Sequence, residues 1–435
     1  MPYTLPGSLH PNNKGAIAWN EKGLLAYGSH YTLVIVDVMR RRIIQTLENH
    51  TAAINYVSWA PEEDFGTSLE GLERCASADV SGQIIVWNVF EGTDISCFRH
   101  ENSSLRTISW FPWEDTKRDF LLALHSPGTL ILWNTSTGDK VWSISYDSQL
   151  DVFALDPYDS RNLAFGVVDG SILLIDEVYL HKAPSSKACR LTVFPSGSNV
   201  CHLQYHNAFQ DILFAASLTE LVCMETVCRC VLWRYTLEAP LLNILCCAER
   251  DAIFTVHTSG LVVLRNCSIV PGGDRWMSCF TYEKIMTAET QRQSLHHRLF
   301  AVAFCPVTQT SMAFLYNSGR IAFYQMAFED SASLKCYRAQ FITDFIGVNE
   351  KLQNSALGAL RLSNIGEMFS LGQGASTVCM RPIDALEGEN EPHLAAIGNN
   401  HGVIHLVDVL NSIVYKELHV HGCPIKFVCS PVNSL

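Results

Sequence analysis

A ten-residue pattern that recurs eight times is the feature of this sequence that most constrains its fold. Each copy has a turn, an alternating apolar run and a closing polar residue, as in residues 80–89 (VSGQIIVWNV) and 126–135 (SPGTLILWNT). The closing residues are Asp37, Asn88, Asn134, Asp176, Glu225, Asn266, Gln325 and Asp408. They lie 51, 46, 42, 49, 41, 59 and 83 residues apart, and most gaps approach the roughly 40–45 residues of a four-stranded propeller blade. The last two gaps must contain insertions.

A second series of short apolar segments, often closed by proline, precedes most copies of the pattern. Examples are residues 53–61 (AINYVSWAP) and 299–306 (LFAVAFCP). They predict inner strands that end at proline, where the missing N–H does no harm. The turn before the third strand needs positive φ and carries glycine at Gly82, Gly128, Gly170, Gly260, Gly319 and Gly402. Together the two series predict an all-β propeller of seven to eight four-stranded blades with loop insertions.

The composition agrees with this fold and excludes some functions. Charged residues make up 17% of the chain, below the roughly 25% of typical soluble domains, and 48% of the residues are apolar. A net charge of −12 argues against broad binding to a nucleic-acid backbone, which requires a basic surface. The N-terminus lacks the pattern of a signal peptide, so the 16 cysteines are expected to be reduced thiols. We expect a soluble intracellular protein that binds proteins and no nucleic acid.

Two segments resemble WD40 repeats, whose third strand ends in Trp-Asp. They are residues 75–89 (CASADVSGQIIVWNV) and 130–134 (LILWN). In that family, a buried network joins a His before the inner strand, a Ser or Thr, an Asp in the turn and the Trp. The resemblance assigns His50, Ser77 and Trp87 to this network, with Ser81 where the Asp is usual.

Other copies match the WD40 pattern less completely. In the fourth copy Asp169 matches the Asp of the turn, while Ile175 replaces the Trp. A buried polar network is valuable only when every member is satisfied, so such blades must depend more on apolar packing. The remaining WD-like signature residues are Asn88, Trp133, Asn134, Asp176 and Asp408.

The order of segments also resembles the N-terminal part of a family of longer WD40 proteins. The matching segments include NKGAIAW, GLLAYGSH, RDFLLALHSPGTLILWN and HLAAIGNNHGVIHLVDV. The resemblance implies a non-catalytic scaffold in a trans-Golgi complex that tethers endosome-derived vesicles, with links to cilium formation and Hedgehog signalling. It further implies partner subunits of a trafficking complex. The implied location is cytoplasmic and peripheral at the trans-Golgi network, with the ciliary base or nucleus as further sites.

Two other uses of WD40 rings stay open at this point. Substrate receptors of cullin-type ubiquitin ligases carry Trp-Asp-x-Arg after the third strand. This chain has Val-Asp-Val-Met, Trp-Asn-Val-Phe and Trp-Asn-Thr-Ser in the equivalent places, which disfavours that function. The other use is the reading of a histone or another peptide through the central channel.

Residues that could carry chemistry form no catalytic or metal-binding pattern. The sequence holds no G-x-S-x-G elbow, no P-loop and no H-E-x-x-H motif. Cys228 and Cys230, with Cys223 nearby, are candidate zinc thiolates, but they do not form a C-x-x-C knuckle. His296 and His297 are adjacent, so on a strand they would point to opposite faces. We predict a non-enzymatic protein without a bound metal or cofactor.

Two surface features concern partners and membranes. Arg40, Arg41 and Arg42 form a basic triplet after the first copy. We interpret it as a solvated turn, because a lipid-binding cluster holds about 4–8 basic residues. Residues 179–198 contain Pro, Ser and Gly and predict a flexible surface loop. Because the net charge is −12, we expect the chain to reach membranes through partner proteins and not by direct insertion.

The long gap before the last copy contains an insertion at residues 327–376, which is either a lid over the propeller or a partner-docking segment. Its apolar residues predict a cluster followed by a short helix that Asn349 caps. The candidate docking residues are Phe341, Phe345, Leu352, Leu357 and Leu360. An extended WD40-like region at 13–326, with the loop near 179–198, precedes the insertion.

Residues 377–435 predict a further WD40-like blade. Within them, residues 424–431 (PIKFVCSP) repeat the inner-strand pattern, and no ten-residue copy follows. This orphan inner strand either begins another blade or closes the ring by pairing with an existing one.

Overall fold

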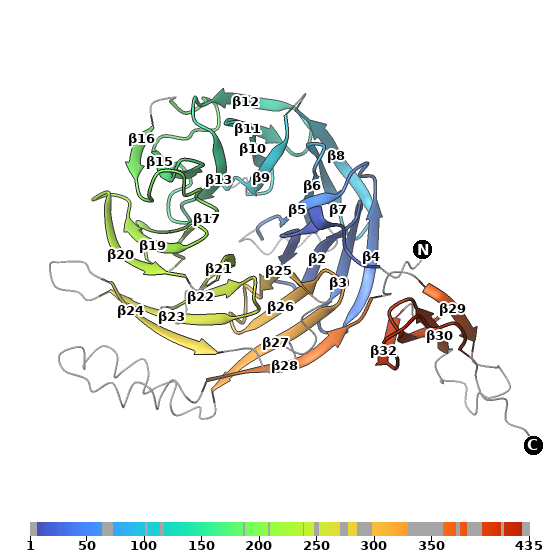
Figure 1. Cartoon of the computed structure of the whole chain (residues 1–435). Coiled ribbons are helices and arrows are strands. Elements are labelled where there is room, and N and C mark those ends of the chain that lie inside the picture. The colour runs from blue at the N-terminus through green and yellow to red at the C-terminus, as the bar shows by residue number, and fades with distance from the viewer. Residues whose placement is uncertain are drawn as a thin grey trace, which may run out of the picture.

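The strands are grouped into four-stranded antiparallel sheets, each built from four strands that are consecutive in sequence. A computed structural model describes residues 7–62, 73–100, 103–113, 117–185, 188–207, 209–237, 239–247, 252–269, 277–284, 298–328, 360–370, 375–380, 394–409 and 413–428. Within these residues, 32 strands form eight sheets. Seven sheets surround a common centre as blades, and the eighth lies beside the ring (Figure 1). The predicted all-β propeller of seven to eight blades is confirmed.

The first four blades contain β1 to β16. Blade 1 comprises β1 (Ile17–Trp19), β2 (Leu24–Ser29), β3 (Thr32–Asp37) and β4 (Arg42–Glu48). Blade 2 comprises β5 (Ile54–Trp59), β6 (Arg74–Asp79), β7 (Gln83–Asn88) and β8 (Thr93–Arg99). Blade 3 comprises β9 (Leu105–Trp110), β10 (Phe120–His125), β11 (Thr129–Asn134) and β12 (Lys140–Ser145). Blade 4 comprises β13 (Leu150–Leu155), β14 (Leu163–Val167), β15 (Ser171–Ile175) and β16 (Cys189–Thr192).

The other sheets contain β17 to β32. Blade 5 comprises β17 (His202–Tyr205), β18 (Ile212–Ala216), β19 (Glu220–Glu225) and β20 (Cys230–Thr236). Blade 6 comprises β21 (Leu241–Cys247), β22 (Ala252–His257), β23 (Val262–Ile269) and β24 (Met277–Lys284). Blade 7 comprises β25 (Leu299–Phe304), β26 (Ser311–Tyr316), β27 (Ile321–Phe328) and β28 (Leu360–Met368). The eighth sheet comprises β29 (Ala375–Met380), β30 (Leu394–Asn399), β31 (Val403–Asp408) and β32 (Ile413–His419).

The second and third strands of each blade form the core, because blades pack against both of their faces. This explains why β10 and β11 read as nearly continuous apolar runs and are almost entirely buried. The fourth strand lies at the rim and is much more exposed, as in β8 and β12. Seven core clusters are built mainly between neighbouring blades, so each interface has its own apolar contact.

Blade 7 packs against blade 1 to close the ring, and each of these two blades is built from four strands that are consecutive in sequence. The first strands follow one another around the centre, and β25 contacts both β21 and β1. Residues 7–15 cross this seam as a strap. The Leu9 backbone N–H donates to the Asn317 carbonyl at 2.8 Å, and the Gly15 N–H donates to the Phe300 carbonyl at 3.2 Å. Leu9 itself is buried in the core that blades 1 and 7 share.

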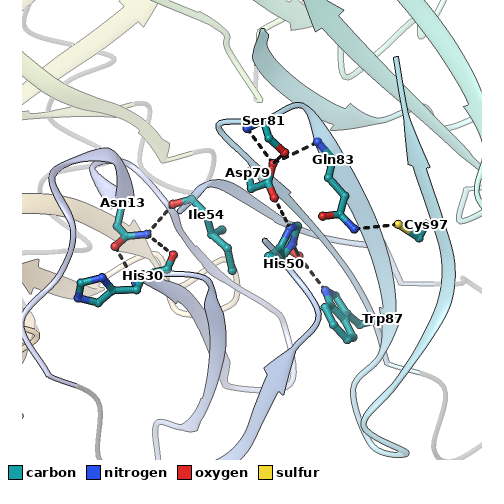
Figure 2. Close-up of polar contacts among 10 residues, drawn as sticks. Asn13, His30, His50, Ile54, Asp79, Ser81, Gln83, Trp87 and Cys97 are labelled. Carbon is teal, nitrogen blue, oxygen red and sulfur yellow. Dashed lines mark hydrogen bonds and ion pairs between the residues drawn. The ribbon is translucent and has the colours of Figure 1, made fainter. Parts of the chain in front are cut away.

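A single buried amide ties the strap to the first two blades (Figure 2). The Asn13 Nδ2 group donates to the carbonyls of His30 at 2.9 Å and Ile54 at 2.7 Å. Its Oδ1 accepts from the backbone N–H groups of His30 and His10, both at 2.8 Å. All the hydrogen-bonding capacity of the Asn13 amide is therefore used, as a fully buried amide requires.

Rim strands lie in two segments for which the sequence predicted a loop or a helix. The segment 179–198 was predicted to be a flexible loop, but β16 lies within it as the fourth strand of blade 4. Leu360 was predicted on a helix, but it is the first residue of β28 and pairs with Phe328 of β27. The apolar pattern predicted a helix at Leu360 because a rim strand and an amphipathic helix both place apolar residues on one side only. Residues 329–359, with the rest of the predicted helix, lie outside the described residues.

The predicted orphan inner strand at 424–431 is not a strand over its described residues, 424–428. Nevertheless, the Ile425 N–H donates to the Asn399 carbonyl at 3.1 Å, as the Ile54 N–H donates to the His30 carbonyl between blades 1 and 2. A Cβ added at Gly398 would lie 2.7 Å from Ile425, and one added at Gly28 would lie 2.9 Å from Ile54. Ile425 thus contacts the eighth sheet as the first residue of a following blade does, and the seven-bladed ring closes without it.

One further property of the described part of the chain concerns membranes. None of its helices has the length and the apolar character needed to cross a bilayer.

Candidate interaction faces and the buried blade network

Blade 2 contains a chain of four buried polar side chains (Figure 2). The Trp87 indole N–H donates to Ser77 Oγ at 2.7 Å, and Ser77 Oγ lies 2.7 Å from His50 Nε2. His50 Nδ1 lies 3.1 Å from Asp79 Oδ2. Because an ionised carboxylate only accepts, the His50 Nδ1–H donates to Asp79. The structure thus joins the three predicted residues to Asp79.

Asp79 holds the place that the sequence assigned to Ser81, and that assignment is wrong. Ser81 is instead a donor to Asp79: its backbone N–H and hydroxyl lie 2.9 and 2.6 Å from Asp79 Oδ1. The Gln83 N–H also donates to that oxygen, at 3.2 Å. Burial alone would raise the pKa of the Asp79 carboxyl, but hydrogen bonds from His50, Ser81 and Gln83 outweigh burial and lower it.

The arrangement contains a Ser, a His and an Asp in hydrogen-bond sequence, which is also the order of a hydrolase triad. Here the side chains of His50 and Asp79 are fully buried, and Ser77 is buried and already accepts the Trp87 N–H. A nucleophilic serine must reach its substrate, and no surface of Ser77 is available for that. The network therefore serves to hold the strands of blade 2 together.

Blade 3 has the same strands but an incomplete network. Ala123 and His125 occupy the positions of Ser77 and Asp79. Trp133 is 5% exposed, and its indole N–H has no hydrogen-bond partner among the described residues. Its ring is instead stacked on Phe98, with the ring centres 4.8 Å apart. Trp133 thus contributes its ring to the packing, with Lys140 Nζ 5.8 Å from the ring centre, and its N–H joins no hydrogen-bond network among the described residues.

His125 is buried in blade 3 in the uncharged form. Its Nδ1 lies 3.2 Å from Ser103 Oγ, and its ring centre lies 5.2 Å from that of His100. Burial, and then the neighbouring His100, lower the pKa of His125 to about 4. A position that carries a stabilised anion in blade 2 therefore carries a neutral imidazole in blade 3.

The remaining signature residues are spread over the turns. Asp169 accepts from the Ser171 N–H and hydroxyl and pairs with Arg190, but its side chain is 49% exposed. It therefore lies on the surface and not in a buried network. Asp176 is also exposed.

The polar residue that closes the third strand caps the turn that follows it. Asp37 Oδ1 accepts from the Arg40 N–H at 2.9 Å, and Asn134 Oδ1 accepts from the Ser136 N–H at 2.9 Å. Asn88 Oδ1 accepts from the Glu91 N–H at 3.3 Å. These Asx turns explain why Asp or Asn recurs at this position without a catalytic role. Asp408 holds the same place in the eighth sheet and is buried.

The candidate metal-binding residues do not form a cluster. Cys223 is buried in β19, whereas Cys228 and Cys230 are exposed where β19 turns into β20. Within the described residues, no group of three or more His, Cys, Asp or Glu side chains is arranged to hold a metal ion. His296 and His297 lie outside those residues.

The basic triplet lies in an exposed turn, and two of its members contact protein groups. Arg40 Nε is 3.7 Å from Asp37 Oδ2. The Arg41 guanidinium donates to the carbonyl of Ile365 on β28, so it links the rims of blades 1 and 7. The triplet thus helps to fasten the seam of the ring from outside.

The turns between third and fourth strands expose large apolar side chains that the sequence reading did not single out. Met39, Phe90 and Val227 each lie two residues after the polar residue that closes the third strand. They are 89%, 53% and 67% exposed. We call the face of the ring that these turns form the outer-turn face. The sequence could have identified them by one feature: each is an apolar residue inside a hairpin turn, where polar residues and glycine are usual.

The opposite face of the ring carries the turns between second and third strands, and we call it the inner-turn face. Its corresponding apolar residues are Tyr31, Val80 and Leu218, which are 55%, 37% and 60% exposed. β27 ends and β28 begins at the outer-turn face, and residues 329–359 form the connection between them in the sequence. Of the candidate docking residues, Phe341, Phe345, Leu352 and Leu357 lie within that connection and outside the described residues.

Comparisons with known proteins agree with this architecture. A family model described as WDR11 first beta-propeller matches residues 7–179. WD repeat-containing protein 11 of Mus musculus is 25% identical over 510 aligned residues, which cover 97% of this chain and 41% of that protein. The human protein of the same name is 24% identical, with the same coverage. The chain thus spans about two fifths of the length of these relatives, and the resemblance predicted from the sequence is confirmed.

A solved structure shares the fold. A chain in the crystal structure of the mitotic checkpoint complex superposes with a TM-score of 0.56 and 11% identity, over 74% of this chain and 90% of that chain. At this level of identity the likeness concerns the fold alone.

Proposed function

We propose that this chain, a WD40-type β-propeller that resembles the first propeller of WD repeat-containing protein 11, is a non-catalytic scaffold for protein–protein interactions. Within that role, we assign it to a complex at the trans-Golgi network that tethers endosome-derived vesicles, with links to cilium formation and Hedgehog signalling. Its location is cytoplasmic and peripheral at that membrane, where partner subunits hold it. The ciliary base or nucleus is a further location.

The observation that carries the scaffold function is the exposure of large apolar side chains at one recurring turn position of the outer-turn face. Met39, Phe90 and Val227 share one position in their turns and project from three different blades. Large exposed apolar side chains that are spread over a rigid ring are suited to enter pockets on a partner. β27 ends and β28 begins at the same face, so the sequence between them is attached to the ring on the side that carries these anchors.

The polar residues of the chain agree with a scaffold. The Ser–His–Asp arrangement of Ser77, His50 and Asp79 is enclosed within blade 2. The recurring Asp and Asn residues cap turns. Both sets therefore hold the propeller in shape and leave its surface to bind partners.

The test is affinity purification of the full chain from cells, followed by mass spectrometry. The Met39→Ser/Phe90→Ser/Val227→Ser variant is compared with Tyr31→Ser/Val80→Ser/Leu218→Ser, which changes the same number of apolar residues on the inner-turn face. Each anchor contributes about 1–2 kcal/mol, so the first variant is expected to lose partner subunits by more than tenfold. The second variant is expected to retain them and to localise normally at the trans-Golgi network.

The connection is tested separately, by replacing residues 330–358 with a short Gly/Ser linker that leaves β27 and β28 intact. Replacement of residues 286–296, between β24 and β25, is the control. Loss of partner subunits in the first variant only supports docking by the connection, and an unchanged partner list supports a lid. Retention of all partners in every variant, or binding of the pure protein to anionic liposomes, would contradict recruitment by the outer-turn face.

A further inference from the structure

The eighth sheet meets the ring at the turn between β26 and β27. Phe369, directly after β28, forms a backbone bridge with Val414 on β32. Ser370 follows it, and its hydroxyl donates to the Ser318 carbonyl in the turn of blade 7. A Cβ added at Gly319 would lie 2.8 Å from Ser370 Oγ, so this approach requires glycine. The junction between ring and eighth sheet is therefore a packed contact.

Arg320 lies at the centre of this junction. Its Nε donates to Glu367 Oε2 on β28 at 3.1 Å, and its terminal nitrogen pairs with Oε1 of the same carboxylate. Its guanidinium also lies 5.6 Å from the centre of the Phe369 ring and 5.7 Å from that of Tyr316. The side chain is 16% exposed, so the interactions of its charge are poorly screened by solvent.

A second, largely buried carboxylate lies on β32, the strand of the eighth sheet that Phe369 contacts. Glu417 on β32 is 12% exposed and lies 3.2 Å from His419 Nε2. Burial raises the pKa of Glu417, and so does the neighbouring Glu367 carboxylate. The positive charges of His419 and Arg320 act in the opposite direction and lower it. The charges of Arg320 and Glu367 on blade 7 therefore act on Glu417 across the junction. Without Arg320, the junction would hold two largely buried carboxylates whose negative charges it no longer balances.

We propose that Arg320 is a latch that fixes the eighth sheet to the ring. It binds Glu367 on blade 7 and lies over the ring of Phe369, whose backbone bridges to β32, and its charge balances that of Glu417 on that strand. The latch sets the orientation of the eighth sheet, and of whatever packs on Ile425, relative to the two faces of the ring. It is independent of the outer-turn face, because Arg320 lies in a turn of the inner-turn face.

The test is hydrogen–deuterium exchange of the full chain at pH 7.5. Arg320→Gln is expected to speed exchange in β32 roughly tenfold while blade 2 keeps its protection. Arg234→Gln is the matched control, because Arg234 pairs with Glu220 at 3.5 Å on blade 5, away from the junction. The double variant Arg320→Gln/Glu417→Gln is expected to recover part of the lost protection, because it removes the repulsion between the two carboxylates.

Each outcome decides between the latch and a purely apolar junction. Exchange in β32 that is unchanged by Arg320→Gln, or a double variant that behaves like Arg320→Gln, would overturn the latch. If Arg320→Gln also speeds exchange in blade 2, exchange is measured in Glu417→Lys instead. That variant leaves blade 7 unaltered and puts a cation in place of the carboxylate that Arg320 balances. That variant is expected to speed exchange in β32 as well, and wild-type exchange would overturn the proposal.

Discussion

Blades 2 and 3 are neighbours with the same strand order, and both end their third strand in Trp-Asn. In blade 2, the Trp87 N–H begins a chain of hydrogen bonds that ends at Asp79. In blade 3, the Trp133 N–H is buried among the described residues without a partner. The difference is one hydroxyl and one carboxylate, and both blades nevertheless form four complete strands.

The polar network therefore stabilises a blade that apolar packing already specifies. β10 and β11 are as deeply buried as β6 and β7, and the Trp133 ring makes a stacked contact with Phe98 of blade 2. A buried network stabilises only when every donor and acceptor is used, so blade 2 has more to lose from a single substitution than blade 3.

The largest effect is expected from Asp79→Ala. This change removes the acceptor of the fully buried His50 N–H and of the partly buried N–H groups of Ser81 and Gln83. Hydrogen bonds to a charged group contribute about 1.5–3 kcal/mol each, so loss of the bond from His50 together with the two from the turn is expected to cost about 3–5 kcal/mol. The free energy of unfolding, from urea titration, is expected to fall by about that amount. Asp169→Ala, at a half-exposed turn of blade 4, is expected to change little; a similar loss in both variants would show that the buried network is not the cause.

Ser77→Ala is expected to have the next largest effect, because it makes blade 2 resemble blade 3. The indole N–H of Trp87 and Nε2 of His50 both lose their partner, and each unsatisfied buried group costs about 1–3 kcal/mol. Urea titration is expected to give a loss of about 2–3 kcal/mol. Ser81→Ala, which removes a hydroxyl from the turn alone, is the control. If the two losses were equal, Ser77 would have no special place in the network.

The repeat spacing made most of the fold predictable. The alternation of apolar residues in each ten-residue copy predicted the third strands, and the prolines predicted where inner strands end, as at Trp59 before Pro61. His50, Ser77 and Trp87 were also identified from the sequence, because residue type and spacing together define that pattern. These features are local, so a single sequence can carry them.

Other features depended on contacts that spacing does not encode. Asp79 was missed because the hairpin of blade 2 puts two residues between it and Gly82, so the expected position fell on Ser81. The rim strands β16 and β28 follow long connections, and only pairing with β15 and β27 makes them strands. The strap over the seam and the latch at Arg320 join residues far apart in sequence, which periodicity cannot reveal.

Acid is expected to weaken blade 3 more than blade 2. The pKa of His125 is about 4 in the folded chain, against an ordinary value of 6.5. Between these values the unfolded state binds more protons at this site, so stability falls as the pH falls from 6.5 towards 4. At pH 5 the loss from His125 is about 1–2 kcal/mol. Urea titrations at pH 7.5 and 5 are expected to show a smaller pH effect in His125→Asn than in the wild type, whereas the exposed His181→Asn variant is expected to show the wild-type effect.

Ala123→Ser is expected to have the smallest effect on stability. It gives blade 3 the hydroxyl that blade 2 has at Ser77. The register aligns Ala123 with Ser77, opposite Ile131 as Ser77 is opposite Ile85, so the new hydroxyl points to the same part of its blade. It offers the Trp133 N–H an acceptor and is itself positioned to donate to the imidazole at His125 or His100. A buried hydrogen bond that replaces an unsatisfied donor stabilises by about 1 kcal/mol. An increase in the urea midpoint is therefore expected in Ala123→Ser and not in Ala164→Ser, which puts a hydroxyl among apolar neighbours in blade 4. If Ala123→Ser instead lowered the midpoint as Ala164→Ser does, then blade 3 would have no place for the hydroxyl, and the two blades would differ in packing and not only in one polar link.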